Sequence, residues 1–219
     1  MPESKPSASK PSESKAPEAA PRRAVVPRHA ASLLVVRRSG AEASVLMGLR
    51  GAKHRFLPNR LVFPGGGVDR ADYRVRPASL LAPEVLHRLE RAARPGLARA
   101  LAVAAARELH EETGLSLGHP PHLEGLDYLC RAVTPPALPI RFNARFFVVD
   151  ETRVSGELAG SGELEQLRFF PLDEALALDI VLATRFVLER LVEWLALTEA
   201  ERRARTHTAL LRNRAGEVE

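Results

Sequence analysis

Three glutamates crowd the end of a predicted helix in the segment ARELHEETGL, residues 106–115. Glu108 precedes Glu111 and Glu112 by three and four residues, so the three side chains share one arc of a helix that should end at Gly114. A helix C-terminus disfavours each negative charge by about 0.3–1 kcal/mol. Like charges at this spacing cost about 0.2–0.5 kcal/mol per pair. A local conflict of this kind indicates either ionic compensation or a function.

Two interpretations fit the glutamate cluster. In the first, the cluster is a solvated helix face on which Arg107 pairs with Glu111, four residues further on. In the second, a divalent cation such as Mg²⁺, which prefers oxygen ligands, turns repelling carboxylates into a ligand set. The segment FPGGGVD, residues 63–69, favours the cation because it leads a short strand into three consecutive glycines. Glycines there can bring backbone to places where any Cβ would clash with a ligand or a packed helix.

The glycine segment and the later helix end together resemble the Nudix hydrolase family. The box of that family reads G-x5-E-x7-R-E-U-x-E-E-x-G-U, where U is a bulky aliphatic residue. Residues 107–115, RELHEETGL, fill the second half at every defined position, and FPGG, residues 63–66, matches the glycine start. With LRFFPLDEAL downstream, the resemblance covers residues 29–180 of the chain.

The sequence departs from this pattern in two places. Between Gly66 and the position of the first box glutamate lie 32 residues instead of five, an insertion of 27, and Arg99 holds that position. The loss of this glutamate leaves the three later ones intact. An insert between the glycine segment and the box helix must emerge close to both, so we expect it to influence substrate choice, with surface decoration as the alternative.

The resemblance implies a metal centre and a mechanism. Glu108, Glu111 and Glu112 would hold Mg²⁺ or Mn²⁺, with the carbonyl of Gly65 as a further ligand, and Arg107 would orient the glutamates through charge-assisted hydrogen bonds. The metal would polarise a phosphoryl oxygen and help to generate a nucleophile from bound water. The reaction would be hydrolysis of the diphosphate bond in a nucleoside diphosphate linked to another moiety.

Two further groups of residues complete the expected site. The acceptor of the water's proton stays open among Glu111 and two glutamates in the loop before LRFF, Glu163 and Glu165. Phosphate binding is expected from backbone at the glycine segment and from arginines near strand ends, because the planar guanidinium binds phosphate bidentately. These candidates are Gly66, Gly67, Arg50, Arg60, Arg141 and Arg145.

The long insert, with TPPALPIRFNARFF downstream, looks most like the Nudix subgroup that includes the mammalian peroxisomal coenzyme A diphosphatase. Coenzyme A or acyl-CoA is therefore the first expected substrate, and ADP-ribose or another dinucleotide the second. The C-terminus GEVE is not a peroxisomal address. One alternative is a non-catalytic nucleotide-sensing module, which only Arg99 favours. Another is a pyrophosphatase that processes RNA and grips it with a basic tail.

Composition limits the remaining function classes. The chain has 219 residues and a net charge of +5, of which residues 1–28 carry +3, and aromatic residues make up 5%, which argues against nucleic-acid binding. No apolar run approaches the roughly 20 residues of a membrane-spanning helix. The single cysteine, Cys130, excludes an internal disulfide and fits a cytoplasmic setting. The oligomeric state stays open, with a homodimer as one option.

The chain divides into a tail and one domain. Residues 1–27 are rich in Pro, Ser and Lys and are predicted to be disordered, whereas residues 28–219 are predicted to form a single domain. Strands and helices interleave, with a helix over 83–93 inside an insert of about 70–95, the box helix over 97–114, and helices over about 183–213. This order favours an α+β fold, and the resemblance implies an α/β/α sandwich with a mixed central sheet and helices on both faces.

Overall fold

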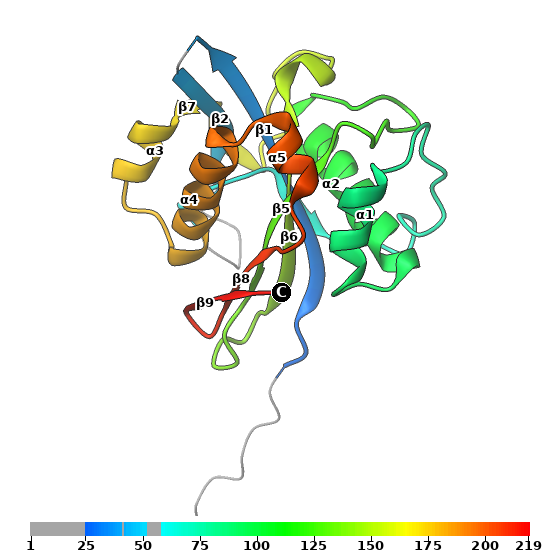
Figure 1. Ribbon diagram of the computed structural model, residues 1–219. Helices are drawn as coiled ribbons and strands as arrows, with labels where there is room; N and C mark the ends of the chain where they lie inside the picture. The colour runs from blue at the N-terminus through cyan, green and yellow to red at the C-terminus, as the bar shows by residue number, and fades with distance from the viewer. Residues whose placement is uncertain (1–24, 41, 52–57) are drawn as a thin grey trace, which may run out of the picture.

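A computed structural model describes residues 25–40, 42–51 and 58–219. Of the tail predicted to be disordered, residues 1–24 lie outside the described residues. The domain is built around one mixed sheet with helices on both faces (Figure 1), so the predicted α/β/α sandwich is confirmed. In the part of the chain that the structure describes, no helix is long and apolar enough to cross a membrane.

The central sheet has the strand order β3-β2-β1-β6-β5-β8-β9, with β4 paired to β1 and β7 paired to β2. The pairs β1–β6 and β5–β8 are parallel and the other pairs are antiparallel. The strands are β1 (Arg28–Ser39), β2 (Glu42–Arg50), β3 (Leu61–Val62), β4 (Gly65–Gly67), β5 (Asp127–Val133), β6 (Phe142–Asp150), β7 (Leu164–Pro171), β8 (Ala209–Arg212) and β9 (Ala215–Val218).

Strand β1 shows why the sheet is covered on both sides. Its apolar run alternates between two cores: Leu33 and Val35 join one cluster, and Leu34 and Val36 join the other. All four side chains are buried, which is the pattern of a strand covered on both faces. The sheet therefore separates two hydrophobic cores, one on each face.

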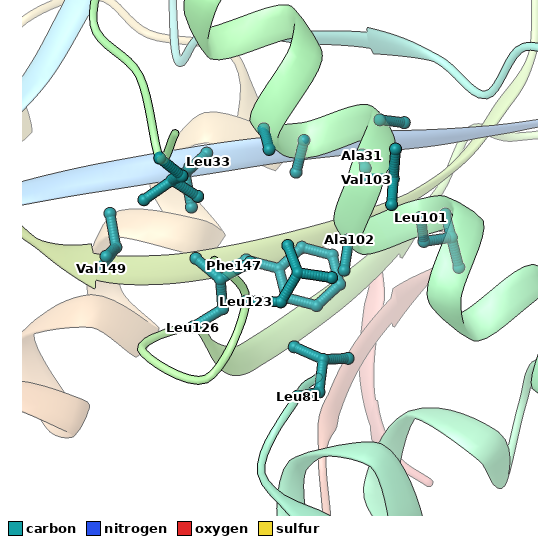
Figure 2. Close-up of a cluster of buried hydrophobic side chains, with 14 of the residues drawn as sticks. Ala31, Leu33, Leu81, Leu101, Ala102, Val103, Leu123, Leu126, Phe147 and Val149 are labelled. Carbon is teal, nitrogen blue, oxygen red and sulfur yellow. The ribbon is translucent and has the colours of Figure 1, made fainter. Parts of the chain in front are cut away.

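The helices divide between these two cores (Figure 1). Helices α1 (Pro83–Glu90) and α2 (Pro95–Thr113) cover one face, and α3 (Leu172–Ala177) and α4 (Leu182–Ala196) cover the other. A 3₁₀ turn, η1 (Glu151–Arg153), and the short helix α5 (Glu199–Ala204) complete the fold. Figure 2 shows the core under α2, in which Leu101 and Ala102 lie on the same side of the sheet as Phe147 and Val149.

Helix α2, which carries the box, is fixed at both ends by local signals. Pro95 occupies its first turn and Gly114 adopts a left-handed conformation, φ 76°, just after its last residue. A Cβ at position 114 would lie 2.6 Å from the carbonyl oxygen of Glu157, so only glycine fits this end. The helix begins two residues before the predicted Leu97 and ends where the sequence predicted.

The C-terminal region differs from the prediction of helices to residue 213. Helix α5 begins with the predicted capping box of Thr198 and Glu201, but helical structure ends at Ala204. The hairpin β8–β9 follows and extends the sheet beside β5, with Leu211 buried in the core. Its turn, Asn213–Arg214, has positive φ at both residues without a glycine, so the usual hairpin signal is absent from the sequence.

Candidate active site

The three glycines form the short strand β4, which lies between β1 and the C-terminal half of α2. A Cβ at Gly65 would lie 2.3 Å from the hydroxyl oxygen of Ser32 and 2.5 Å from the carbonyl oxygen of Ala31. A Cβ at Gly66 would lie 2.5 Å from a carboxylate oxygen of Glu108. The absence of side chains therefore lets β4 pair closely with β1 and lets the Glu108 carboxylate lie directly over the glycine backbone.

Glu112 is the most deeply buried of the three box glutamates, with 4% of its surface exposed. One of its carboxylate oxygens accepts a hydrogen bond of 2.7 Å from the backbone N–H of Gly65. Burial raises the pKa of Glu112 to about 8, the charge of Glu108 adds to the rise, and the Gly65 hydrogen bond opposes it. Burial also raises the pKa of Glu108, against the opposing effect of Arg107.

The guanidinium of Arg107 lies between Glu108 and Glu111. Its Nη1 donates hydrogen bonds of 2.8 Å to Glu108 and to Glu111. Burial disfavours its charge, but hydrogen bonding to Asp72 and the nearby Glu108 outweigh that effect, so the pKa of Arg107 is raised. Glu111 differs from its two neighbours because its side chain is 54% exposed. Of the three box glutamates, Glu108 and Glu112 are the two that the described residues place against the glycine strand.

Asp72 belongs to this network although the sequence analysis did not identify it. Its carboxylate accepts hydrogen bonds of 3.0 and 3.2 Å from Arg107, and 1% of the residue is exposed. A sequence signal for it exists: counted forward from Gly66, Asp72 stands at the acidic position of G-x5-E, with aspartate in place of glutamate. The same spacing separates the buried Asp72 from the exposed Asp69, and it places the 27 inserted residues after Asp72.

A cavity of about 560 Å³ opens beside the glycine strand, on the face of the sheet that α4 covers. Most of its lining is apolar, including Val62, Phe63, Leu138 and Phe146. All three glycines of β4 border it, and so does Arg50. The cavity is therefore an apolar chamber bordered by the glycine strand, and Glu108 and Glu112 lie against that same strand.

The four arginines predicted to bind phosphate differ in their positions relative to the cavity. Arg50 borders the cavity, lowers the pKa of Glu112 by its charge, and has a buried Nε without a hydrogen-bond partner among the described residues. Arg60 instead pairs with the exposed Asp179 at 2.9 Å. Arg141 donates to the backbone carbonyls of Thr134 and Val25. Neither Arg60 nor Arg141 is among the residues that line the cavity.

Arg145 lies on the opposite side of the sheet. It alternates along β6 with Phe146, which lines the cavity, and it donates hydrogen bonds to the carbonyls of Ala92 and Asn143. It is fully buried, and burial lowers its pKa to about 10. The structure therefore places Arg145 on the face away from the cavity, where it ties the insert to the sheet, and Arg60 on the surface beside Asp179.

The two loop glutamates also differ in position. Glu163 precedes β7, and its charge contributes to the raised pKa of both Glu108 and Glu112. Glu165 lies in β7 opposite Leu49. Of the two, Glu163 is the one whose charge acts on both Glu108 and Glu112.

The donor set suits a hard divalent cation. Within residues 25–40, 42–51 and 58–219, no three acidic, histidine or cysteine side chains are gathered closely enough to hold a metal ion, and Glu111 is hydrogen-bonded to Arg107. Yet burial raises the pKa of both the buried Glu112 and the half-buried Glu108, and the charge of Glu108 adds to the rise at Glu112. A cation that takes oxygen ligands would stabilise the charged form of these carboxylates, which burial disfavours. For Gly65, the structure describes an N–H directed at Glu112, and the role of its carbonyl stays a prediction.

Comparisons with known proteins find one family model and several solved structures that this chain resembles. Residues 96–195 match the family model described as NUDIX domain. A NUDIX hydrolase from Alicyclobacillus acidocaldarius is 27% identical over 77% of this chain and 92% of that chain, with a TM-score of 0.58. A MutT NUDIX hydrolase from Burkholderia pseudomallei is 25% identical over 76% of this chain and 99% of that chain, with a TM-score of 0.49.

A third solved structure, the MutT protein from Methanosarcina mazei Go1, shares the fold at 19% identity over 78% of this chain and 97% of that chain, with a TM-score of 0.50. No curated protein matches the sequence. Residues 96–195 thus match a Nudix domain, and the fold of the chain is like that of a solved Nudix hydrolase. Hydrolases of this kind generally depend on a divalent metal ion.

Proposed function

We propose that the protein hydrolyses the diphosphate bond of a nucleoside diphosphate linked to another moiety, with Mg²⁺ or Mn²⁺. The observation that carries this proposal is the placement of Glu108 and Glu112 against a glycine strand that also borders a cavity of about 560 Å³. Scissile phosphates bound along that strand would lie next to the box carboxylates, while an apolar part of the substrate would fill the cavity.

Each residue near the strand has a proposed task. Glu108 and Glu112, joined by Glu111 and the carbonyl of Gly65, would hold the cation. When bound, the cation supplies charge neutralisation at the phosphates and an acidified water. Arg107 keeps Glu108 and Glu111 oriented through its two hydrogen bonds of 2.8 Å.

The phosphate and the proton require two further groups. Arg50 would bind the second phosphate, because its Nε is buried without a partner among the described residues at the edge of the cavity. Glu163 would accept the proton of the attacking water, since its charge acts on both Glu108 and Glu112. Glu111 is the alternative proton acceptor. Gly66 and Gly67 would offer backbone to the phosphates.

The substrate proposed first is coenzyme A or an acyl-CoA, with ADP-ribose or another dinucleotide as the second candidate. The long insert and the downstream TPPALPIRFNARFF segment support coenzyme A by resemblance. The apolar lining of the cavity, which includes Phe63, Leu138 and Phe146, suits an adenine ring or an acyl chain.

The full-length protein should be incubated with coenzyme A, an acyl-CoA, ADP-ribose and a diadenosine polyphosphate, with Mg²⁺ or Mn²⁺, and the products separated chromatographically. We expect nucleoside monophosphate products from at least one substrate and loss of at least about 100-fold in kcat for Glu112→Gln. Glu111→Gln should also lower kcat. Binding of these compounds without turnover by the wild type would favour a nucleotide-sensing module instead, and unchanged turnover in Glu112→Gln would remove the metal assignment.

A further inference from the structure

One wall of the cavity is a row of paired residues that crosses the sheet from β4 to β8. Gly67 pairs with Ala30 of β1, and Ala30 pairs with Ala144 of β6. Ala144 pairs with Ala132 of β5, which pairs with Leu211 of β8. All five residues line the cavity. Because neighbouring strands lie about 4.8 Å apart, the four pairings carry this row about 19 Å away from the glycine strand.

The charged side chains of the cavity come from the two ends of this row. Arg50 and Ser32 belong to the end beside the glycine strand, where Ser32 pairs with β4. Arg214 belongs to the end at β8. The other polar side chains of the lining are Thr134 and Thr184, and the hydroxyl of each is hydrogen-bonded to a backbone group. The cavity is therefore an apolar channel with a guanidinium at each end.

Arg214 reaches the cavity from the turn of the β8–β9 hairpin. Since β8 runs parallel to β5, this turn lies at the same end of the sheet as the loop that follows β5 (Figure 1). That loop supplies Pro135 and Leu138 to the cavity lining. Arg212, two residues before Arg214, pairs with Glu217 across the hairpin at 3.7 Å. The Arg214 guanidinium, in contrast, has no ion-pair or hydrogen-bond partner among the described residues.

The hairpin is anchored to the sheet at the end opposite its turn. The backbone N–H and carbonyl of Glu219 form hydrogen bonds of 2.9 Å with Thr208. The Glu219 carboxylate accepts hydrogen bonds from Arg131 at 2.5 Å and from the hydroxyl of Tyr128 at 3.2 Å. Both of these donors come from β5, the strand beside the hairpin. The anchored hairpin thus holds the backbone of Arg214 in place beside the cavity.

We propose that Arg214 determines substrate specificity by binding a second anionic group, which an apolar arm of the substrate carries away from the scissile diphosphate. A guanidinium binds carboxylates bidentately, and one guanidinium balances the single charge of a carboxylate better than the larger charge of a phosphate. The substrate class is then a nucleoside diphosphate linked to a long, mainly apolar arm that ends in a carboxylate. This inference rests on the proposed function for turnover, whereas binding tests it independently.

The test compares two acyl-CoA esters with chains of equal length, glutaryl-CoA and pentanoyl-CoA, which differ by a carboxylate in place of a methyl group. Dissociation constants are measured by isothermal titration calorimetry in EDTA, so that no substrate is cleaved. The full-length wild type is compared with Arg214→Gln and Arg214→Lys. Arg212→Gln is the matched control, because Arg212 is an exposed arginine of the same hairpin that does not line the cavity. ADP-ribose serves as a ligand without a long arm.

We expect the wild type and Arg212→Gln to bind glutaryl-CoA about tenfold more tightly than pentanoyl-CoA. Arg214→Gln should bind the two esters equally, and Arg214→Lys should keep part of the preference because it keeps the charge. ADP-ribose affinity should change by less than about twofold in Arg214→Gln. Equal affinity of the wild type for the two esters, no binding of either ester, or an undiminished preference in Arg214→Gln would overturn the proposal. So would an equal loss in Arg212→Gln.

Turnover separates this inference from the proposed function. With Mg²⁺, Arg214→Gln should raise KM for glutaryl-CoA by about tenfold and leave kcat within about threefold, because Arg214 lies across the sheet from the box carboxylates. A fall in kcat with unchanged KM would contradict a role in binding the arm. If the wild type prefers glutaryl-CoA in EDTA but cleaves no diphosphate with Mg²⁺ or Mn²⁺, the proposed function fails and the role of Arg214 stands.

Discussion

Alanine substitution at the two adjacent glycines of β4 should have very different effects on the active site. A Cβ at Gly66 would lie 2.5 Å from Oε1 of Glu108, 2.6 Å from its Cδ and 2.8 Å from its Oε2. A Cβ at Gly67 would have no atom within 4 Å. The two substitutions add the same methyl group to the same strand, so they form a matched pair.

The size of the effect follows from the contact distance. Ordinary contacts of a Cβ begin at 3.4 Å, so the Glu108 carboxylate must retreat by roughly 0.9 Å, the difference from 2.5 Å. Misplacement of a catalytic group by about 1 Å costs about 100-fold in rate. Because the obstructing atoms are the end of a side chain, the fold itself should lose no more than about 1 kcal/mol.

The assay measures kcat at saturating Mg²⁺ together with the dissociation constant of Mn²⁺. Gly66→Ala should lower kcat by about 100-fold and weaken Mn²⁺ binding by about tenfold, with a melting temperature close to that of the wild type. Gly67→Ala should change Mn²⁺ binding by less than about threefold. Unaltered kcat and Mn²⁺ binding in Gly66→Ala, or equal effects in the two variants, would refute the placement of Glu108 over β4.

The remaining predictions concern the other groups around the cavity. Glu163→Gln should lower kcat by about 100-fold, whereas Glu165→Gln should leave it within about threefold, as single-turnover assays would show. Arg50→Ala should raise KM by at least about tenfold through loss of a phosphate contact, and Arg60→Ala should leave KM unchanged. With divalent ions chelated, stability should fall as pH rises from about 4.5 to about 8, because the raised pKa of Glu112 makes the folded protein hold its proton more tightly than the unfolded chain. The free energy of unfolding in urea should not show this fall with pH in Glu112→Gln. In the wild type, saturating Mg²⁺ should remove the fall.

The main elements of the fold were predictable because their signals are local. The proline at the start of α2 and the glycine after it, the capping box at Thr198 and Glu201, and the apolar run of β1 each lie within a few residues of the structure that they specify. The C-terminal hairpin was not predictable in this way. Its turn, Asn213–Arg214, has no glycine, and its strands are stabilised by pairing with β5, about 80 residues earlier in the chain.

The motif of the candidate site was predictable from the sequence, but the residues that contact the motif from other elements were not. The box spacing brings Glu108 and Glu112 to one side of α2, and the glycines provide the space in front of them. Which arginine reaches the site depends on the strand's face, because alternate residues of β6 point to opposite sides, and this placed Arg145 away from the cavity. Asp72 meets Arg107 across 35 residues of chain; the spacing from Gly66 marks Asp72 as the acidic position of the box, but the 27 inserted residues separate it from the arginine.

The two departures from the Nudix box are physically connected through the segment 67–73. A glutamate at position 99 would oppose the carbonyl oxygen of Tyr73, to which Arg99 now donates a hydrogen bond, because both groups would be acceptors. An arginine there stabilises the insert against α2, and the same segment then delivers Asp72 to Arg107. The substitution Arg99→Glu should therefore weaken the attachment of the insert without improving metal binding. The melting temperature should fall and the Mn²⁺ dissociation constant should not decrease.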